Sequence, residues 1–238
     1  PDRIRSAIRD PGDPHFPPTG CVALENTHNR CGGSVITPEE IAAVAAVAHE
    51  QGIPVHLDGA RVFNAAVALS APVSEVVRSV DSVTFCLSKG LGAPVGSLLC
   101  GSKAYIERAY RWRKLLGGAM RQVGILAAAG LVALEEGVDR LGEDHENARA
   151  LAEGLAAIPG IDIDPRSVQT NIVVFDVAAI GTSPQAFVAG LMDRGVKLAD
   201  VGGSRMRAVT SYEVNRNDID VALQEIAELA VRATPALA

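Results

Sequence analysis

The sequence has 238 residues, of which 48% are hydrophobic, 21% are charged and 4% are aromatic, and its formal net charge is -6. A chain of this length and hydrophobicity can bury a sizeable core, which excludes an intrinsically disordered protein. The acidic balance, the few aromatic rings and the lack of a basic run argue against nucleic acid and anionic membranes as partners.

Short apolar runs alternate with alanine-rich runs of helical period in the first half of the chain. Pro38, followed by Glu39 and Glu40, indicates a helix start, because carboxylates are favourable near the positive end of the helix dipole. Gly52 marks the end of that helix. The other predicted elements are strands at 21–24, 53–57, 82–86 and 97–100 and a short helix at 62–69.

This alternation of strands and helices predicts an α/β fold with a mostly parallel sheet and helices on both faces. In such a sheet the carboxyl ends of consecutive strands meet at one edge. Ligands bind beyond that edge, so residues that directly follow the strands are the first candidates for function.

The second half of the chain has a different pattern. From Ser102 to Ile158 it is predicted to be nearly all helical, with breaks at Gly117-Gly118 and Gly137. A smaller α+β domain follows Pro159-Gly160. Its predicted elements are strands at 172–175 and 206–210 and helices at 184–194 and 218–232, before a frayed tail at 234–238. We therefore expect a large domain over residues 1–140 and a small one over 141–238.

We expect neither a membrane span nor an export signal in this sequence. The longest apolar run near the middle, Val123 to Leu134, has 12 residues, whereas a membrane span needs about 20. The chain opens with mixed charge, unlike a signal peptide. The four cysteines show no metal-ligand spacing, and we interpret them as reduced, mostly buried thiols of a cytoplasmic protein.

A lysine in a glycine-rich loop is the first candidate for chemistry. Ser88-Lys89-Gly90-Leu91-Gly92 directly follows the predicted strand at 82–86. The glycines let the backbone approach a ligand closely. A lysine there, with few other charges around it, suits a Schiff base, because desolvation lowers the amine pKa and makes it nucleophilic. Taken alone, the segment also fits a surface lysine in a turn.

Asp58 ends the neighbouring predicted strand and is the second candidate. A carboxylate at this position could pair with a protonated pyridine nitrogen, or it could cap the helix predicted at 62–69. Asp58 and Lys89 are 31 residues apart, a spacing of about one strand–helix–strand crossover. We therefore expect both residues at the same sheet edge.

Five ordered blocks carry a family resemblance. They are LENTHN at 24–29, HLDGARVFN at 56–64, SKGL at 88–91, RWRK at 111–114 and GGAMRQ at 117–122. These blocks resemble the threonine aldolase family, and the resemblance covers essentially the whole chain, weakening after about Asp162. It implies the aspartate-aminotransferase-like fold (fold type I), the cofactor pyridoxal 5'-phosphate (PLP) and a homotetramer. It also implies cleavage of L-threonine or L-allo-threonine to glycine and acetaldehyde.

The resemblance implies roles for individual residues at the cofactor. Lys89 would form the Schiff base, and Asp58 would be the partner of the pyridine nitrogen. Arg61, Ser88 and Arg121 would lie near the cofactor.

It also implies roles at the substrate. Arg207 would clamp the α-carboxylate, with Arg61 and Lys114 nearby, and His15 would face the substrate hydroxyl. Lys114 and Arg121 could reach the active site of a neighbouring subunit. Trp112, beside them, is expected to anchor a subunit interface.

The sequence departs from the family pattern at its start. Family members begin with a phosphate-cradling loop and a histidine that stacks on the pyridine ring, and this sequence contains neither. We therefore expect the large domain, 1–140, to be incomplete at its N-terminus. A loop and helix N-terminus of that kind normally hold such a phosphate.

Other polar residues keep more than one interpretation. His28, at the end of a predicted strand, could be a site residue or a structural histidine. His49, His145 and the pair Glu143-Asp144 are expected on solvated helix faces. Two alternative functions also stay open: another PLP-dependent lyase or racemase acting on a different β-substituted amino acid, and an inactive truncated domain that acts only in assembly.

Overall fold

The computed structural model describes residues 1–233, so the tail predicted to fray, 234–238, lies outside the described residues. The chain forms two compact units. The first unit comprises residues 1–27 and 35–139, and the second comprises residues 28–34 and the chain from Arg140 onward. Within the described residues no helix is both long and apolar enough to cross a membrane.

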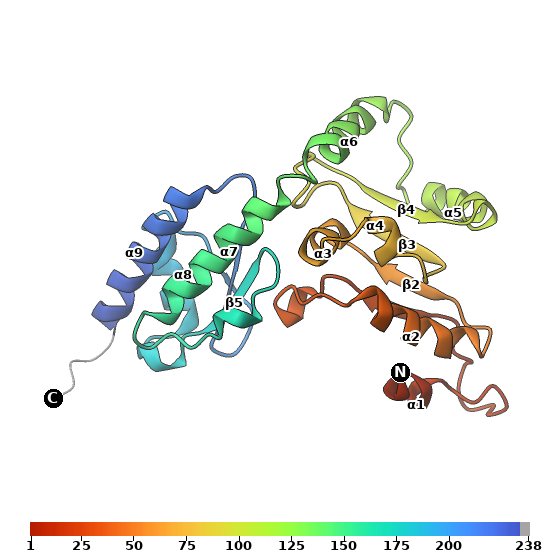
Figure 1. The fold of residues 1–238 in the computed structure, drawn as a ribbon, viewed down its shortest axis with the longest axis horizontal. Coiled ribbons are helices and arrows are strands. Elements are labelled where there is room, and N and C mark those ends of the chain that lie inside the picture. Colours follow the sequence, from red (N-terminus) through yellow and green to blue (C-terminus); the bar gives the residue numbers. More distant parts are fainter. Residues whose placement is uncertain (234–238) are drawn as a thin grey trace. The chain divides into compact units, whose positions relative to one another are not determined.

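The first unit contains a four-stranded sheet of order β1-β2-β3-β4 (Figure 1). β1, β2 and β3 are parallel, and β4 runs antiparallel to β3. The strands are β1 Val22–Glu25, β2 Val55–Asp58, β3 Ser82–Cys86 and β4 Ser97–Gly101. The helices are α1 Asp2–Ala7, α2 Pro38–His49, α3 Val62–Leu69, α4 Val73–Val76, α5 Lys103–Leu115 and α6 Gly124–Glu136. The predicted α/β class and mostly parallel sheet are therefore confirmed.

Local signals explain where α2 begins. The Thr37 hydroxyl accepts a hydrogen bond from Glu40 N at 3.2 Å, and the Glu40 carboxylate accepts one from Thr37 N at 2.8 Å. This reciprocal capping box satisfies two backbone N–H groups that the first helical turn leaves unpaired. The helix then packs its apolar side on the sheet, where Ile41 is buried against Leu57 and Val83.

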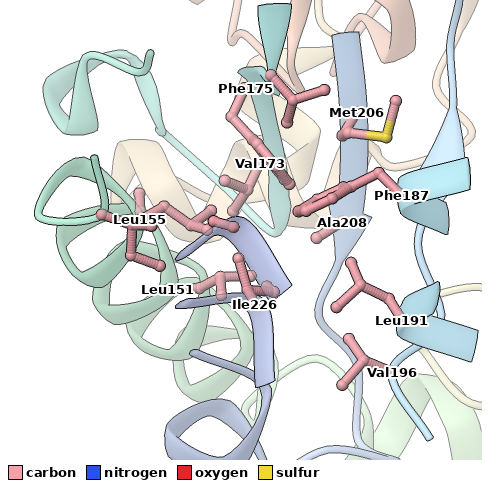
Figure 2. Packing of buried hydrophobic residues seen from close by; sticks show 14 of the residues in the cluster. Leu151, Leu155, Val173, Phe175, Phe187, Leu191, Val196, Met206, Ala208 and Ile226 are labelled. Carbon is pink, nitrogen blue, oxygen red and sulfur yellow. The ribbon is translucent and has the colours of Figure 1, made fainter. Parts of the chain in front are cut away.

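The second unit is built around a three-stranded sheet of order β5-β7-β6, in which both pairs are antiparallel. Its strands are β5 Ile172–Asp176, β6 Ala199–Asp200 and β7 Arg205–Val209. Its helices are α7 Leu141–Ala156, α8 Pro184–Met192 and α9 Arg216–Ala233, with short 3-10 turns at Asn29–Cys31, Pro165–Ser167 and Ala178–Ile180. Figure 2 shows side chains of α7, α8 and the strands meeting in one core, which includes Leu155, Phe175 and Phe187.

Residues 28–34 follow β1 in the chain but pack in the second unit, whereas the sequence assigned them to the large domain. The Thr170 hydroxyl donates to the Gly33 carbonyl at 2.8 Å. A Cβ on Gly33 would lie 2.6 Å from the same hydroxyl oxygen, and its φ of +72° also favours glycine. The segment is therefore held by long-range contacts that local sequence does not encode.

Two expectations about burial are wrong. Asp144 is fully buried and His145 is 7% exposed, although a solvated helix face was predicted for both. Burial raises the pKa of Asp144, and the Arg140 guanidinium, 3.1 Å away, opposes that rise. Burial lowers the pKa of His145 to about 4, so the imidazole is neutral at neutral pH.

The cysteines were expected to be mostly buried, and this expectation is also wrong. Cys21, Cys31 and Cys100 are exposed and Cys86 is half-buried, and all four are free thiols. Cys100 is exposed because it lies on β4, whose residues are all exposed.

Candidate active site

The carboxyl ends of β1, β2 and β3 form one edge of the first unit's sheet, as predicted. Glu25 is in register with Asp58, and Asp58 with Thr84. Beyond the strands, Asn26 N donates to the Asp58 carbonyl at 2.9 Å, and Gly59 N donates to the Thr84 carbonyl at 2.8 Å. The polar residues that follow these strands therefore gather at one edge, where ligands of parallel sheets bind.

Asp58 lies on this edge with its side chain exposed. Its Oδ1 accepts a hydrogen bond from Ala60 N at 3.1 Å, which closes a turn. The N-cap residue of α3 is Arg61, and there is no side-chain capping hydrogen bond at this helix start. The alternative interpretation of Asp58 as the helix cap is therefore wrong. A Cβ on Gly59 would lie 2.9 Å from the Thr84 carbonyl oxygen. The turn after Asp58 therefore packs directly against the backbone of β3.

Lys89 is in the loop that joins β3 to β4. Leu87 N donates to the Gly96 carbonyl at 2.9 Å, Ala93 N donates to the Leu87 carbonyl at 3.0 Å, and Gly92 N donates to the Lys89 carbonyl at 2.9 Å. The Leu87 side chain is buried, while Lys89 and Ser88 are exposed. The loop backbone is thus fixed and the lysine amine is accessible.

Lys89 and Asp58 carry opposite charges at this edge without neutralising each other. Neither side chain forms an ion pair in the part of the chain that the structure describes. An exposed amine and an exposed carboxylate at one edge can each contact a bound molecule. Arg61, half-buried at the start of α3, follows Asp58 by three residues.

Arg207 is on β7, the central strand of the second unit's sheet. Met206 and Ala208 point into the core, so Arg207 lies on the other face of the strand. Its Nη1 donates to Asn29 Oδ1 at 3.0 Å, and its Nε is buried with no hydrogen-bond acceptor within residues 1–233. A guanidinium with an unsatisfied N–H and no carboxylate partner is suited to bind an anion.

His15 was expected to face the substrate hydroxyl. His15 lies in the chain before β1, toward the amino end of that strand, and its ring Nδ1 is 3.0 Å from Asp13 Oδ1. Its side chain is 85% exposed. The expected contact with a substrate hydroxyl stays a prediction. By contrast, His28 follows the carboxyl end of β1 by three residues.

Lys114 and Arg121 are both exposed, Lys114 in the last turn of α5 and Arg121 between α5 and α6. Their predicted approach to the site of a neighbouring subunit stays a prediction.

Asn29 is a residue that sequence reasoning missed. The LENTHN block at 24–29 that contains it was recognised from the sequence. However, no spacing or periodicity indicates that the Asn29 amide would bind Arg207, 178 residues further along the chain.

A shallow surface hollow at the amino ends of β2 and β3 is a separate feature. It is lined by His49, Asp81 and alanines of α2. Asp81 Oδ2 accepts hydrogen bonds from Val55 N at 2.7 Å and lies 2.8 Å from His49 Nε2. These bonds join α2, β2 and β3, so the cluster holds the sheet together at the end opposite to Lys89.

Comparison with known proteins identifies a family. A family model described as beta-eliminating lyase matches residues 1–179. Low-specificity L-threonine aldolase 1 of Arabidopsis thaliana is 42% identical over 224 residues, which is 93% of this chain and 63% of that protein. The low specificity L-threonine aldolase of Escherichia coli K12 is 51% identical over 154 residues, 65% of this chain and 45% of that protein. The chain thus spans less than two thirds of the length of these curated relatives.

Solved structures share the fold. A putative L-allo-threonine aldolase from Listeria monocytogenes superposes with a TM-score of 0.77 at 21% identity, covering 94% of this chain and 63% of that chain. A threonine aldolase from Leishmania major gives a TM-score of 0.74 at 18% identity, covering 96% of this chain and 66% of that chain. These neighbours confirm the predicted fold class.

Proposed function

Because the chain belongs to the beta-eliminating lyase family, we propose that the protein is a PLP-dependent aldolase that cleaves L-threonine or L-allo-threonine to glycine and acetaldehyde. The observation that carries this proposal is the placement of Lys89 and Asp58. Both are exposed, and neither is engaged in an ion pair within the described residues. Asp58 is the last residue of β2, and Lys89 follows the adjacent parallel strand β3 at the same edge. The curated relatives named as threonine aldolases support the choice of substrate.

The residues present fit PLP at two of its functional groups. Lys89 would bond covalently to the aldehyde carbon, since its amine is accessible on a loop whose backbone is fixed. The Asp58 carboxylate would hold a proton on the pyridine nitrogen, and Ser88 and Arg61 would lie beside the ring. When bound, the cofactor supplies an electron sink for the bond that breaks.

Arg207 would bind the substrate carboxylate. Two parallel hydrogen bonds from its guanidinium would stop the substrate from rotating, and its unsatisfied Nε supplies one of them. Holding the carboxylate in this way would orient the bond between Cα and Cβ for cleavage. Lys114 and Arg121, both exposed, would add positive charge near the substrate and cofactor.

A histidine would take the proton from the substrate hydroxyl. The family resemblance gives this role to His15, and His28, which follows the carboxyl end of β1 by three residues, is a second candidate. A ring nitrogen of a neutral imidazole can accept a proton and return it later in the reaction.

The exposed apolar residues of α5, of α6 and of the segment between them support assembly with further copies of this chain, to the tetramer that the family resemblance implies. Trp112 is 62% exposed, Leu116 is 81% exposed and Ile125 is 77% exposed. Apolar side chains gathered in this number on a monomer surface usually mark an interface. The proposal also includes a cytoplasmic location. Light scattering of the purified protein and cell fractionation test these two parts.

The decisive experiment is borohydride reduction of the full-length protein with PLP, followed by peptide mass mapping. We expect the cofactor on the peptide that contains Lys89, and not on those of Lys103, Lys114 or Lys197. Lys89→Ala should abolish labelling and threonine cleavage, while the matched control Lys103→Ala, at another exposed lysine, should keep both. Labelling at Lys89 with no glycine formed from threonine would indicate a different PLP enzyme. No labelling at all would indicate an inactive domain.

A further inference from the structure

Leu87 and Leu91, each two positions away from Lys89 in the chain, anchor the loop that carries this lysine. Leu87 is 7% exposed and Leu91 is 6% exposed, whereas Ser88 and Lys89 between them are exposed. The position of the lysine therefore depends on what these two leucines pack against. Helix α6 supplies that surface in the first unit.

Three small residues of α6 and its end form the contact face. Gly130, Ala133 and Gly137 are buried, whereas most other α6 residues are exposed. They are spaced at i, i+3 and i+7, which places them on one side of a helix. This face lies against the Lys89 loop, so α6 approaches the loop through residues that have almost no side chain.

The space at the two glycines is too small for a Cβ. At Gly130 it would lie 2.8 Å from Leu87 Cδ1. At Gly137 it would lie 2.5 Å from the Ala133 carbonyl oxygen of α6 and 2.6 Å from the Leu91 carbonyl oxygen of the loop. Gly137 has φ -74° and ψ -28°, which any residue adopts, so the lack of space is what requires glycine there. At Gly124, in the first turn of the same helix, a Cβ would meet nothing within 4 Å.

We propose that Gly130 and Gly137 are positioning residues that set the place of Lys89 through Leu87 and Leu91. The inference rests on the proposed role of Lys89 and goes beyond it by assigning α6 a function. The two contacts differ in kind. At Gly137 a methyl group would be caught between the backbone of α6 at Ala133 and the loop backbone at Leu91, and neither can rotate away, whereas at Gly130 it would meet the end of a flexible side chain.

The test measures PLP capture by Lys89 rather than turnover alone. The full-length protein and its variants are titrated with PLP, reduced with borohydride, and the Lys89 peptide is quantified against those of Lys103, Lys114 and Lys197. For Gly137→Ala we expect half-maximal labelling to need about tenfold more PLP, equivalent to about 1.4 kcal/mol. We also expect kcat to fall about 10- to 100-fold, since a displacement of about 1 Å can cost about 100-fold. Gly124→Ala, the control on the same helix, should behave as the unmodified protein.

A second pair of variants keeps the test decisive if Gly137→Ala does not fold. Gly130→Ala should weaken labelling less than Gly137→Ala, and Leu87→Val in the same chain should restore it, because valine has no Cδ atom at the crowded position. A folded Gly137→Ala with unchanged labelling, or no recovery in the double variant, would overturn the inference. Absence of Lys89 labelling in the unmodified protein would instead refute the proposed function.

Discussion

Replacing Asn29 with aspartate asks whether Arg207 binds a carboxylate. In the structure Arg207 Nη1 donates to Asn29 Oδ1 at 3.0 Å, and Arg207 has no carboxylate partner in the part of the chain described. Asn29→Asp places a carboxylate of the same shape at this position. The new ion pair should hold Arg207 and compete with the carboxylate of the substrate.

The magnitude follows from the strength of one charge-assisted hydrogen bond. Such a bond contributes about 1.5–3 kcal/mol, and each 1.4 kcal/mol is about tenfold in binding. We therefore expect KM for threonine to rise about 10- to 100-fold in Asn29→Asp. Asn29→Ala loses only the contact that orients the guanidinium, and its KM should rise less, about fivefold for about 1 kcal/mol.

Steady-state kinetics with threonine, together with thermal unfolding, provide the assay. Asn217→Asp is the matched control, because it adds the same charge at an exposed asparagine of the second unit. It should leave KM unchanged. If Asn29→Asp folds and its KM stays within about twofold of the unmodified protein, Arg207 does not bind the substrate carboxylate and the reasoning fails.

Two further predictions concern single carboxylates. Asp58→Ala should fold normally, because the Asp58 side chain is exposed and accepts one hydrogen bond within a turn. Its kcat should fall, because a neutral pyridine is a poorer electron sink than a protonated one. Full turnover in this variant would remove Asp58 from the mechanism. The hydrogen bond from Val55 N, and then that with His49, lower the pKa of Asp81. Its contribution to stability is therefore present above about pH 4 and is lost as pH falls through the lower folded pKa. Urea unfolding of Asp81→Asn should show a loss of stability at pH 7 that shrinks toward pH 3, and a pH-independent loss would contradict this assignment.

Much of the first unit could be predicted from the sequence because its signals are local. The helix at 62–69 and the strand at 82–86 were predicted with the bounds that the structure shows. Pro38 and the carboxylates after it indicate the start of α2 through groups within one turn. Short parallel connections then bring Asp58 and the Lys89 loop to one edge without any knowledge of packing.

Burial and long-range partners were decided only by the tertiary structure. The polar pair Asp144-His145 suggests a solvated helix face, yet both residues are buried in the second unit, where the Thr210 hydroxyl bonds to the Asp144 carbonyl at 2.6 Å. Residues 28–34 join that unit through contacts with chain more than 130 residues away. The spacing of apolar residues and the residue types at turns involve only a few neighbouring residues. The contacts described above depend instead on which surfaces meet after the helices and strands have formed. Gly137 combines both kinds of signal: its place at a helix break could be predicted from the sequence, whereas the close approach of the Leu91 carbonyl exists only once α6 lies against the Lys89 loop.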